Sequence, residues 1–237
     1  MSKLYWTMTK SPFQHLLFGL LFFLLVALDI YFGSTSYIFF RVVSKPLILL
    51  SLIFYFLQNR SGMKQSLSLY TLLALVFSLM GDVFLLFDQL SEAFFVLGLG
   101  SFLLAHICYA FCFYLQSNSK IRLDFWVMTL LLSSYGVALY VVLYIHLGNI
   151  KIPVAIYILA ILIMVITAYK RKGNVSDNGF LMVFIGALSF IISDSLLAIN
   201  KFLIPLPYSN FLVMGTYATA QYLIIRGLIK DINGNTD

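Results

Sequence analysis

Residues 67–87 read LSLYTLLALVFSLMGDVFLLF, and Asp82 is the only charged residue in this stretch. About 20 consecutive apolar residues are enough to cross the hydrocarbon core of a bilayer as an α-helix. A carboxyl group in hydrocarbon costs about 2.5–3.5 kcal/mol even on the lenient insertion scale, so an acid at this depth usually faces a polar interior and has a function there. The stretch therefore predicts a membrane-spanning helix that carries a functional carboxyl group.

The composition extends this interpretation to the whole chain. Of its 237 residues 62% are hydrophobic and 10% are charged, whereas globular proteins average about 45–50% and 25%. Strands of an outer-membrane barrel are excluded, because they would be about 10 residues long with strict period-two alternation. The predicted fold is an all-α, polytopic transmembrane helix bundle that forms a single domain, residues 1–237. We predict eight spans, at about residues 15–32, 38–57, 67–87, 93–115, 125–146, 152–169, 179–200 and 208–229.

The basic residues predict the orientation of the spans. Four of the 15 Lys and Arg residues lie toward one side of the membrane: Arg41, Lys45, Lys151 and Lys201. The others lie toward the opposite side: Lys3, Lys10, Arg60, Lys64, Lys120, Arg122, Lys170, Arg171, Lys172, Arg226 and Lys230. By the positive-inside rule both termini are cytoplasmic, and we expect the cytoplasmic (inner) membrane of a bacterium. The scattered basic residues indicate contact with anionic lipids and no nucleic-acid partner.

A second acid, Asp194, lies in the apolar sequence FIISDSLLAI. Gly81-Asp82 and Ser193-Asp194 each stand inside a span and are each followed by a leucine three residues after the acid. This similarity is compatible with a parallel four-plus-four repeat. A chance match in apolar sequence explains it equally well.

The helical rise places both acids at one depth. At about 1.5 Å per residue, Asp82 and Asp194 lie roughly 8–9 Å below the outer surface, and Lys45 lies near that level. We expect Lys45 to be their counter-charge, although it could instead snorkel outward. Pro46 behind it predicts a local opening of the helix. Asp29, about one turn from the end of its span, is predicted to be an interface residue.

A deeper polar layer is predicted about 10 Å below the acids by the same rise. It consists of His106, Tyr109, Tyr217 and Gln221. For His106, a structural role and a catalytic role are both open. Asn200 follows the stripe of Asp194 along its helix. A metal ion bound by His106, Asp82 and Asp194 is the less favoured alternative, because the depths differ and a single histidine is few for zinc.

Five motifs in order connect the chain to a known family. They are Lys45-Pro46, Gly81-Asp82, GSFLLAHICY at 100–109, GALSFIISDSLLA at 186–198 and YATAQYLI at 217–224. Their order over the predicted spans two to eight resembles the YhhN-like membrane family, the lysoplasmalogenases. The resemblance implies hydrolysis of the vinyl ether of lysoplasmalogens to a fatty aldehyde and glycerophosphoethanolamine or glycerophosphocholine. The implied partners are this lysophospholipid substrate and the membrane lipids, with no cofactor and no metal; the oligomeric state is open.

Two buried carboxyl groups suit this chemistry. Protonation of the β-carbon of a vinyl ether needs a protonated acid, and the resulting cation needs a carboxylate; burial and mutual repulsion can separate two acids into these roles. We expect Asp82 and Asp194 to be the catalytic pair, without assigning the acid. Supporting roles are expected for Lys45, His106, Tyr109, Tyr217, Gln221 and Asn200. A proton- or cation-coupled transporter, a lipid-translocating carrier and a non-catalytic scaffold are the alternatives.

Overall fold

The computed structural model describes residues 12–35, 38–117 and 123–234, and within these ranges the chain is helical, with no strand. Eight helices in the described residues are long and apolar enough to cross a bilayer, which confirms the predicted helix bundle. Their bounds are α1 Pro12–Gly33, α2 Ile38–Asn59, α3 Gln65–Leu86, α4 Glu92–Tyr114, α5 Leu123–Leu143, α6 Lys151–Lys170, α7 Asp177–Phe202 and α8 Ser209–Gly234. Two short 3₁₀ turns, Tyr144–His146 and Gly148–Ile150, connect α5 to α6.

The observed helix ends differ from the predicted span ends where a helix continues beyond its apolar run. The apolar pattern predicted an end of the last span at residue 229, but α8 continues to Gly234. Asp231 near this end is buried and pairs with the guanidinium of Arg171, which follows α6. Backbone hydrogen bonds continue a helix regardless of side-chain polarity. A hydropathy boundary therefore marks where the apolar run ends and not where the helix ends.

The opening predicted at Pro46 is absent. Pro46 lies inside α2, which continues as one helix from Ile38 to Asn59. Proline has no N–H, so this turn lacks one backbone hydrogen bond. Neighbouring helices often tolerate such a proline in a membrane span. The continuous helix at Pro46 therefore gives the transporter alternative no structural support.

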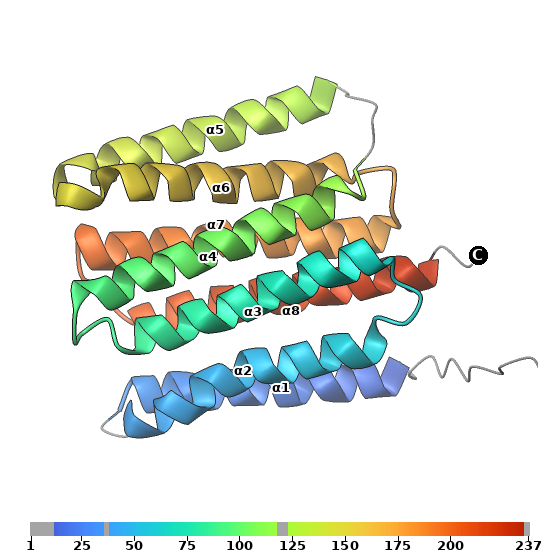
Figure 1. Cartoon of the computed structure of the whole chain (residues 1–237), viewed down its shortest axis with the longest axis horizontal. Helices are drawn as coiled ribbons and strands as arrows, with labels where there is room; N and C mark the ends of the chain where they lie inside the picture. The colour runs from blue at the N-terminus through green and yellow to red at the C-terminus, as the bar shows by residue number, and fades with distance from the viewer. Residues whose placement is uncertain (1–11, 36–37, 118–122, 235–237) are drawn as a thin grey trace, which may run out of the picture.

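Six helices form the interior of the bundle and two flank it (Figure 1). The pairs α3–α4 and α7–α8 pack most extensively; α6 contacts α4 and α7, and α2 contacts α3 and α8. Helix α1 lies outside against α2 and α8, and α5 lies outside against α6 and α7. Large apolar side chains cover the outer surface, as expected for a protein in lipid. The buried polar side chains that form the site come mainly from the six inner helices.

Two glycines allow the inner pairs to approach closely. A Cβ added to Gly81 would lie 2.6 Å from a ring carbon of Phe102, and one added to Gly186 would lie 2.9 Å from the carbonyl oxygen of Ala220. Small residues at helix contacts let backbones approach in membranes. The first contact joins α3 to α4 directly beside Asp82, and the second joins α7 to α8. The acids are therefore carried by the most tightly packed helices.

Helix α1 begins and α8 ends at the same end of the bundle, where the α2–α3 and α6–α7 turns also lie (Figure 1). The described basic residues of the predicted cytoplasmic group belong to these segments. Lys3, Lys10, Lys120 and Arg122 lie outside the described residues. Which side faces the cytoplasm stays a prediction, as does the four-plus-four repeat.

Candidate active site

Asp82 forms a buried ion pair. It lies on α3 with its side chain 3% exposed, and Lys45 Nζ on α2 approaches its Oδ1 to 3.4 Å. The Tyr217 hydroxyl on α8 donates a 2.8 Å hydrogen bond to the other carboxylate oxygen. Lys45 is itself buried, so the predicted counter-charge is present for Asp82, but not for Asp194, and the snorkelling alternative is wrong. A lysine paired in this way favours the ionised form of its partner carboxyl group.

Behind Tyr217, buried side chains continue the hydrogen bonds into the core. The Gln221 amide nitrogen lies 3.5 Å from the Tyr217 hydroxyl and donates to Ser78 Oγ at 2.9 Å. Tyr109 donates to Gln221 Oε1 at 2.6 Å. All members of this chain are buried. Every member of this network is paired, and a fully paired buried network is rigid. It therefore holds Tyr217, and through it the Asp82 carboxylate, in one orientation.

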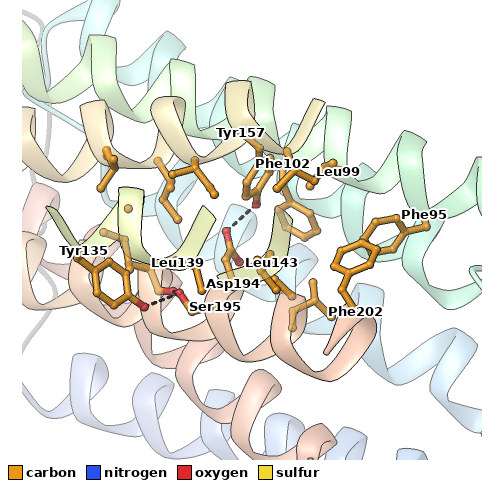
Figure 2. A pocket seen from close by; sticks show the side chains of 18 of the residues that line it. Phe95, Leu99, Phe102, Tyr135, Leu139, Leu143, Tyr157, Asp194, Ser195 and Phe202 are labelled. Carbon is orange, nitrogen blue, oxygen red and sulfur yellow. Dashed lines mark hydrogen bonds between the residues drawn. The ribbon is translucent and has the colours of Figure 1, made fainter. Parts of the chain in front are cut away.

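Asp194 on α7 has its own pair of partners. The Tyr157 hydroxyl on α6 donates a 2.6 Å hydrogen bond to Asp194 Oδ2 (Figure 2). His106 Nε2 on α4 lies 3.1 Å from the same oxygen and 3.0 Å from the Tyr157 hydroxyl. The Asp194 side chain is 16% exposed, against 0% for His106. Asp194 is therefore anchored through one oxygen and is the more accessible of the two predicted acids.

The predicted separation of about 10 Å between the acids and the deeper layer is wrong for two of its members. His106 contacts Asp194 and Tyr217 contacts Asp82 directly. The estimate measured each residue from the end of its own span, as if the helices were parallel. Helix α4 instead crosses α7 obliquely (Figure 1), and a tyrosine side chain reaches far along the bundle axis.

Aromatic rings separate the two acid clusters. The Phe190 ring lies 4.7 Å from the His106 ring and 5.5 Å from the Tyr217 ring, measured between centroids. Phe102 packs edge-on against Tyr217 at 5.7 Å. These rings are buried and carry no charge. Phe190 therefore packs against one member of each acid cluster.

Both acids line one polar cavity of about 650 Å³ between α2, α3, α7 and α8. Its volume falls within the range of about 300–1,000 Å³ that is typical of small-molecule sites. Its polar lining is Arg41, Lys45, Asp82, Asp88, Gln89, Ser193, Asp194, Asn200, Ser209, Asn210 and Tyr217. The cavity brings together charges that the sequence places on three separate helices, α2, α3 and α7, with uncharged polar side chains of α8.

A second, apolar pocket of about 60 Å³ begins on the other side of Asp194, between α4, α5, α6 and α7 (Figure 2). Apart from Asp194, its lining is nearly all hydrocarbon and aromatic, with Tyr135 hydrogen-bonded to Ser195 at 2.7 Å on its α5 side. Asp194, Leu85, Phe102 and Leu197 line both spaces. The carboxyl group of Asp194 therefore lies at the boundary between a polar and an apolar compartment.

Asn200 contributes to the cavity and to the shape of its rim. Its Oδ1 accepts a 2.9 Å hydrogen bond from the backbone N–H of Leu206 in the α7–α8 connection. Asn200 lies in the cavity lining, and its supporting role stays a prediction. Among the described residues no three His, Cys, Asp or Glu side chains are arranged to bind a metal ion.

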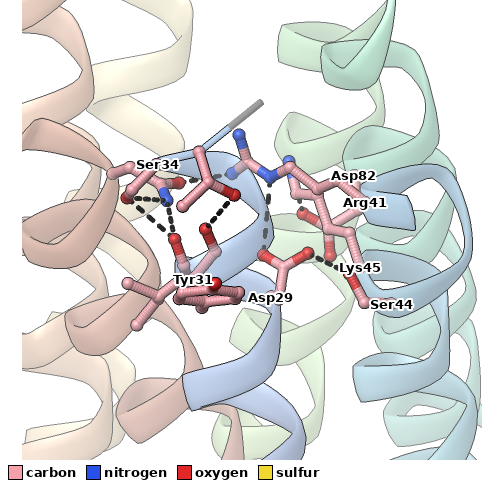
Figure 3. Close-up of polar contacts among 10 residues, drawn as sticks. Asp29, Tyr31, Ser34, Arg41, Ser44, Lys45 and Asp82 are labelled. Atoms are coloured by element: carbon pink, nitrogen blue, oxygen red, sulfur yellow. Dashed lines mark hydrogen bonds and ion pairs between the residues drawn. The ribbon is translucent and has the colours of Figure 1, made fainter. Parts of the chain in front are cut away.

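The prediction for Asp29 is wrong. Asp29 is fully buried and accepts a 2.7 Å hydrogen bond from Ser44, while Arg41 Nε lies 3.5 Å from its other oxygen (Figure 3). We had placed it at the interface from its distance to the end of the span. The signal was available, since Arg41 begins the next span across a short connection. An acid and a base at the same level on consecutive spans predict a pair.

Sequence reasoning also missed Tyr157 and Asn210. Tyr157 is one of 15 tyrosines, and nothing in its local sequence distinguishes it from those in the aromatic belt. Asn210 bonds Arg41 from the first turn of α8, a helix far away in sequence. Both contacts depend on tertiary packing, which a hydropathy pattern does not encode.

Together, the eight apolar helices and the buried acidic cavity define an integral, multi-pass membrane protein. The chain belongs to the YhhN family, whose model matches residues 40–228. This match confirms the resemblance predicted from the five motifs.

Curated relatives are named for an activity. Lysoplasmalogenase TMEM86A of Homo sapiens is 35% identical over 160 residues, which cover 66% of this chain and 63% of that protein. Lysoplasmalogenase TMEM86B of Homo sapiens is 30% identical over 164 residues, covering 69% and 65%. Lysoplasmalogenase of Mycobacterium tuberculosis is 32% identical over 162 residues, covering 65% and 58%. The chain spans less than two thirds of the length of these relatives. No solved structure matches it.

Proposed function

We propose that the protein hydrolyses the vinyl ether bond of lysoplasmalogens within the membrane, releasing a fatty aldehyde and glycerophosphoethanolamine or glycerophosphocholine. The observation that carries this proposal is the position of Asp194 where the polar cavity meets the apolar pocket. A lysoplasmalogen has its vinyl ether at the junction between a polar headgroup and a hydrocarbon chain. A substrate that fills both compartments presents this bond to Asp194. The relatives that are named lysoplasmalogenase support the same activity.

In the first step, Asp194 acts as general acid. Its protonated carboxyl group transfers the proton to the β-carbon of the vinyl ether, and the π electrons that form the new C–H bond leave an oxocarbenium ion at the α-carbon and oxygen. Tyr157 and His106 hold one oxygen of Asp194, which leaves the other for the substrate.

In the second step, water captures the cation. The Asp194 carboxylate, having lost its proton, takes a proton from a water molecule while the oxygen of that water bonds to the α-carbon. The hemiacetal then breaks its bond to the glycerol oxygen, which receives the hydroxyl proton through Asp194, and the aldehyde is released. The proton is returned, so the net reaction consumes one water. Asp194 serves as acid and then as base, as general acid–base catalysis allows.

Asp82 supplies the fixed negative charge. Lys45 favours its ionised form, and it lines the cavity in which the cation develops. A preorganised charge directed at the developing charge is usually the largest contribution to catalysis. Tyr217, Gln221 and Tyr109 keep the carboxylate in place through their hydrogen bonds. The two acids predicted as a pair therefore have different roles in this mechanism.

The test is product release from purified protein in detergent. We expect aldehyde from a 1-alkenyl lysophospholipid and no fatty acid from its 1-acyl counterpart. Asp194→Asn should reduce the rate at least about 100-fold, because acid–base catalysis contributes about 10²–10⁴. Asp82→Asn should also lose most turnover, and the double variant should be little worse than Asp194→Asn, since residues that act as a unit are not additive.

The matched control is Asp124→Asn. Asp124 is an acid at the opposite end of the bundle, paired with Lys172, and should leave the rate unchanged. Folding of each variant is checked by gel filtration. A folded wild-type protein that releases no aldehyde would contradict the proposal and favour a carrier, which needs two compartments to act. A folded Asp194→Asn variant with more than about a tenth of wild-type activity would exclude Asp194 as the acid.

The bacterial cytoplasmic membrane stays our expectation for the location. It is tested by fractionating cells that express the tagged chain. The oligomeric state is open, and gel filtration of the purified protein measures it alongside the folding control.

A further inference from the structure

We propose that Arg41, held in place by Asp29 and Asn210, binds the anionic phosphodiester of the lysolipid headgroup. The inference rests on the proposed function and identifies which part of the substrate the polar cavity recognises. The sequence analysis uses Arg41 only as a topology signal and expects Lys45 to be the counter-charge with a supporting role. The structure assigns these two cations to different tasks.

Lys45 is committed to the catalytic cluster. Its ammonium lies 3.4 Å from Asp82 and its side chain is 7% exposed. Using it for a phosphate would leave a buried carboxylate without its counter-charge, which is strongly destabilising. Lys201, also near this end of the bundle, is paired with Asp88 at 3.0 Å. Arg41 is the cation of the cavity lining that is partly exposed, with 19% of its side chain accessible.

The guanidinium of Arg41 is fixed from two sides (Figure 3). Its Nη2 donates a 2.5 Å hydrogen bond to Asn210 Oδ1, and its Nε lies 3.5 Å from Asp29 Oδ2. Asp29 is held by Ser44, and the Asn210 amide nitrogen donates to the carbonyl oxygen of Ile30 at 3.0 Å. Each supporting residue therefore has an anchor of its own. A positioned guanidinium loses less entropy on binding than a free one.

The bonding of Arg41 leaves capacity for a ligand. Arginine has five N–H donors in a planar fork. Among the described residues one of them makes a hydrogen bond, at Nη2, and Nε is buried beside Asp29, so the capacity for a ligand lies in the remaining N–H groups of Nη1 and Nη2. The fork matches the geometry of phosphate oxygens, which it binds through two parallel hydrogen bonds. A phosphodiester in the cavity would engage the N–H groups that the protein does not use.

The order of the compartments agrees with the order of groups in the substrate. Arg41 and Asn210 line the polar cavity, Asp194 lies at its boundary, and the apolar pocket follows. A lysoplasmalogen has its phosphate, glycerol, vinyl ether and hydrocarbon chain in the same sequence. Binding of the phosphate at Arg41 would fix the position of the ether bond along this path, which is how remote contacts contribute to catalysis.

The test compares the binding of two saturated ether lipids that the protein cannot hydrolyse by this route. One is a 1-alkyl lysophosphatidylcholine, and the other is the 1-alkylglycerol of equal chain length, which lacks the phosphate. We expect the wild-type protein to bind the phosphate-containing lipid at least about tenfold more tightly, the effect of one good charge-assisted hydrogen bond. Arg41→Met should reduce this preference to about twofold or less, and Arg41→Lys should give an intermediate value because it keeps the charge without the fork.

Lys201→Met is the matched control, because it removes a cation at the same end of the bundle and should keep the full preference. Since Arg41→Met leaves Asp29 buried and unpaired, the variant Asp29→Asn/Arg41→Met removes both charges and tests the same loss in a protein less prone to unfold. A preference that persists in either folded variant overturns the proposal, and so does a wild-type protein without preference.

The binding assay needs no turnover, so its outcome is separate from that of the proposed function. Phosphate preference in a protein that does not cleave a vinyl ether would overturn the hydrolase and keep this site. Hydrolysis without phosphate preference would overturn this site and keep the hydrolase.

Discussion

The side chains of Lys45 and Asp82 are 7% and 3% exposed, and each replaces its hydration mainly by the other. Removing two charges from water costs several kcal/mol per ion, and their attraction offsets this only when further hydrogen bonds complete the site. Tyr217 supplies such a bond to Asp82. The stability of the ion pair therefore depends on the surrounding hydrogen bonds. Removing one charge should destabilise the protein more than removing both.

Lys45→Met should therefore destabilise the protein. Breaking a buried pair typically costs about 3–5 kcal/mol, which for a domain of this size lowers the melting temperature by at least about 5 °C. Thermal melting of the purified protein in detergent measures the change. Lys45→Met/Asp82→Asn, which removes both charges, should recover most of the loss.

If Lys45→Met melts like the wild type, Asp82 is not held as an anion by Lys45, and its role in the mechanism would have to be reassigned. If the double variant melts no higher than the single one, the loss comes from packing of the lysine stem and not from an unpaired charge.

At the scale of single residues, the sequence predicts the charged side chains of the site better than the neutral ones. Asp82, Asp194 and Lys45 stand out because ionisable groups are costly in apolar runs. Tyr157 and Asn210 do not stand out, because neutral polar residues occur throughout membrane helices and their partners are fixed only by tertiary contacts. Asp29 was assigned wrongly because its depth was considered without its partner, Arg41.

At the scale of helices, the sequence predicts which segments are helices better than it predicts how these helices are arranged. Each span is long enough to be recognised by hydropathy, whereas the continuity of α2 through Pro46 and the extension of α8 to Gly234 depend on neighbouring helices. The same holds for the apolar pocket, which no single helix forms. Its volume of about 60 Å³ is far below the range of about 300–1,000 Å³ that is typical of ligand pockets.

Accommodating a chain therefore requires helices around the pocket to separate. Helix α5 is suited to move, because it lies outside the inner bundle and contacts mainly α6 and α7. The Tyr135–Ser195 hydrogen bond connects it to α7 beside the pocket. Outward displacement of α5 would extend the pocket toward the lipid, from which the substrate arrives.

Filling the pocket should then select against long chains. Ala198 lines the pocket on α7, and Ala198→Phe would occupy space that the chain needs. We expect hydrolysis of a long-chain alkenyl lysolipid to fall about tenfold relative to a short-chain one, the discrimination that a few methylenes produce in an apolar pocket. Relative rates on the two lipids in detergent measure this shift.

Ile192→Phe is the control, because Ile192 lies on the same helix, is 50% exposed at the outer surface and should leave the ratio unchanged. An unchanged ratio in folded Ala198→Phe would mean that the chain does not enter this pocket.

At the scale of the whole molecule, the position of the cavity toward one end of the bundle decides which side of the membrane it faces. The cavity residues come from the start of α2, the end of α3, the end of α7 and the start of α8. These segments lie at the end of the bundle opposite to the start of α1 and the end of α8 (Figure 1). Whichever side the start of α1 and the end of α8 face, the polar cavity belongs to the other half of the membrane. For the lysolipid substrate that we propose, orientation therefore decides from which leaflet the headgroup enters.

The positive-inside rule predicts cytoplasmic termini and a cavity in the outer half of the membrane. A fluorescent protein that folds only in the cytoplasm, fused after residue 237, should be bright, and an alkaline phosphatase active only outside should be inactive there. Fusions ending at residue 205 place the reporters after α7, so they should give the opposite result. Bright fluorescence at both positions would mean that α8 does not cross the membrane. Active phosphatase after residue 237 with inactive phosphatase after residue 205 would reverse the orientation and move headgroup entry to the cytoplasmic leaflet.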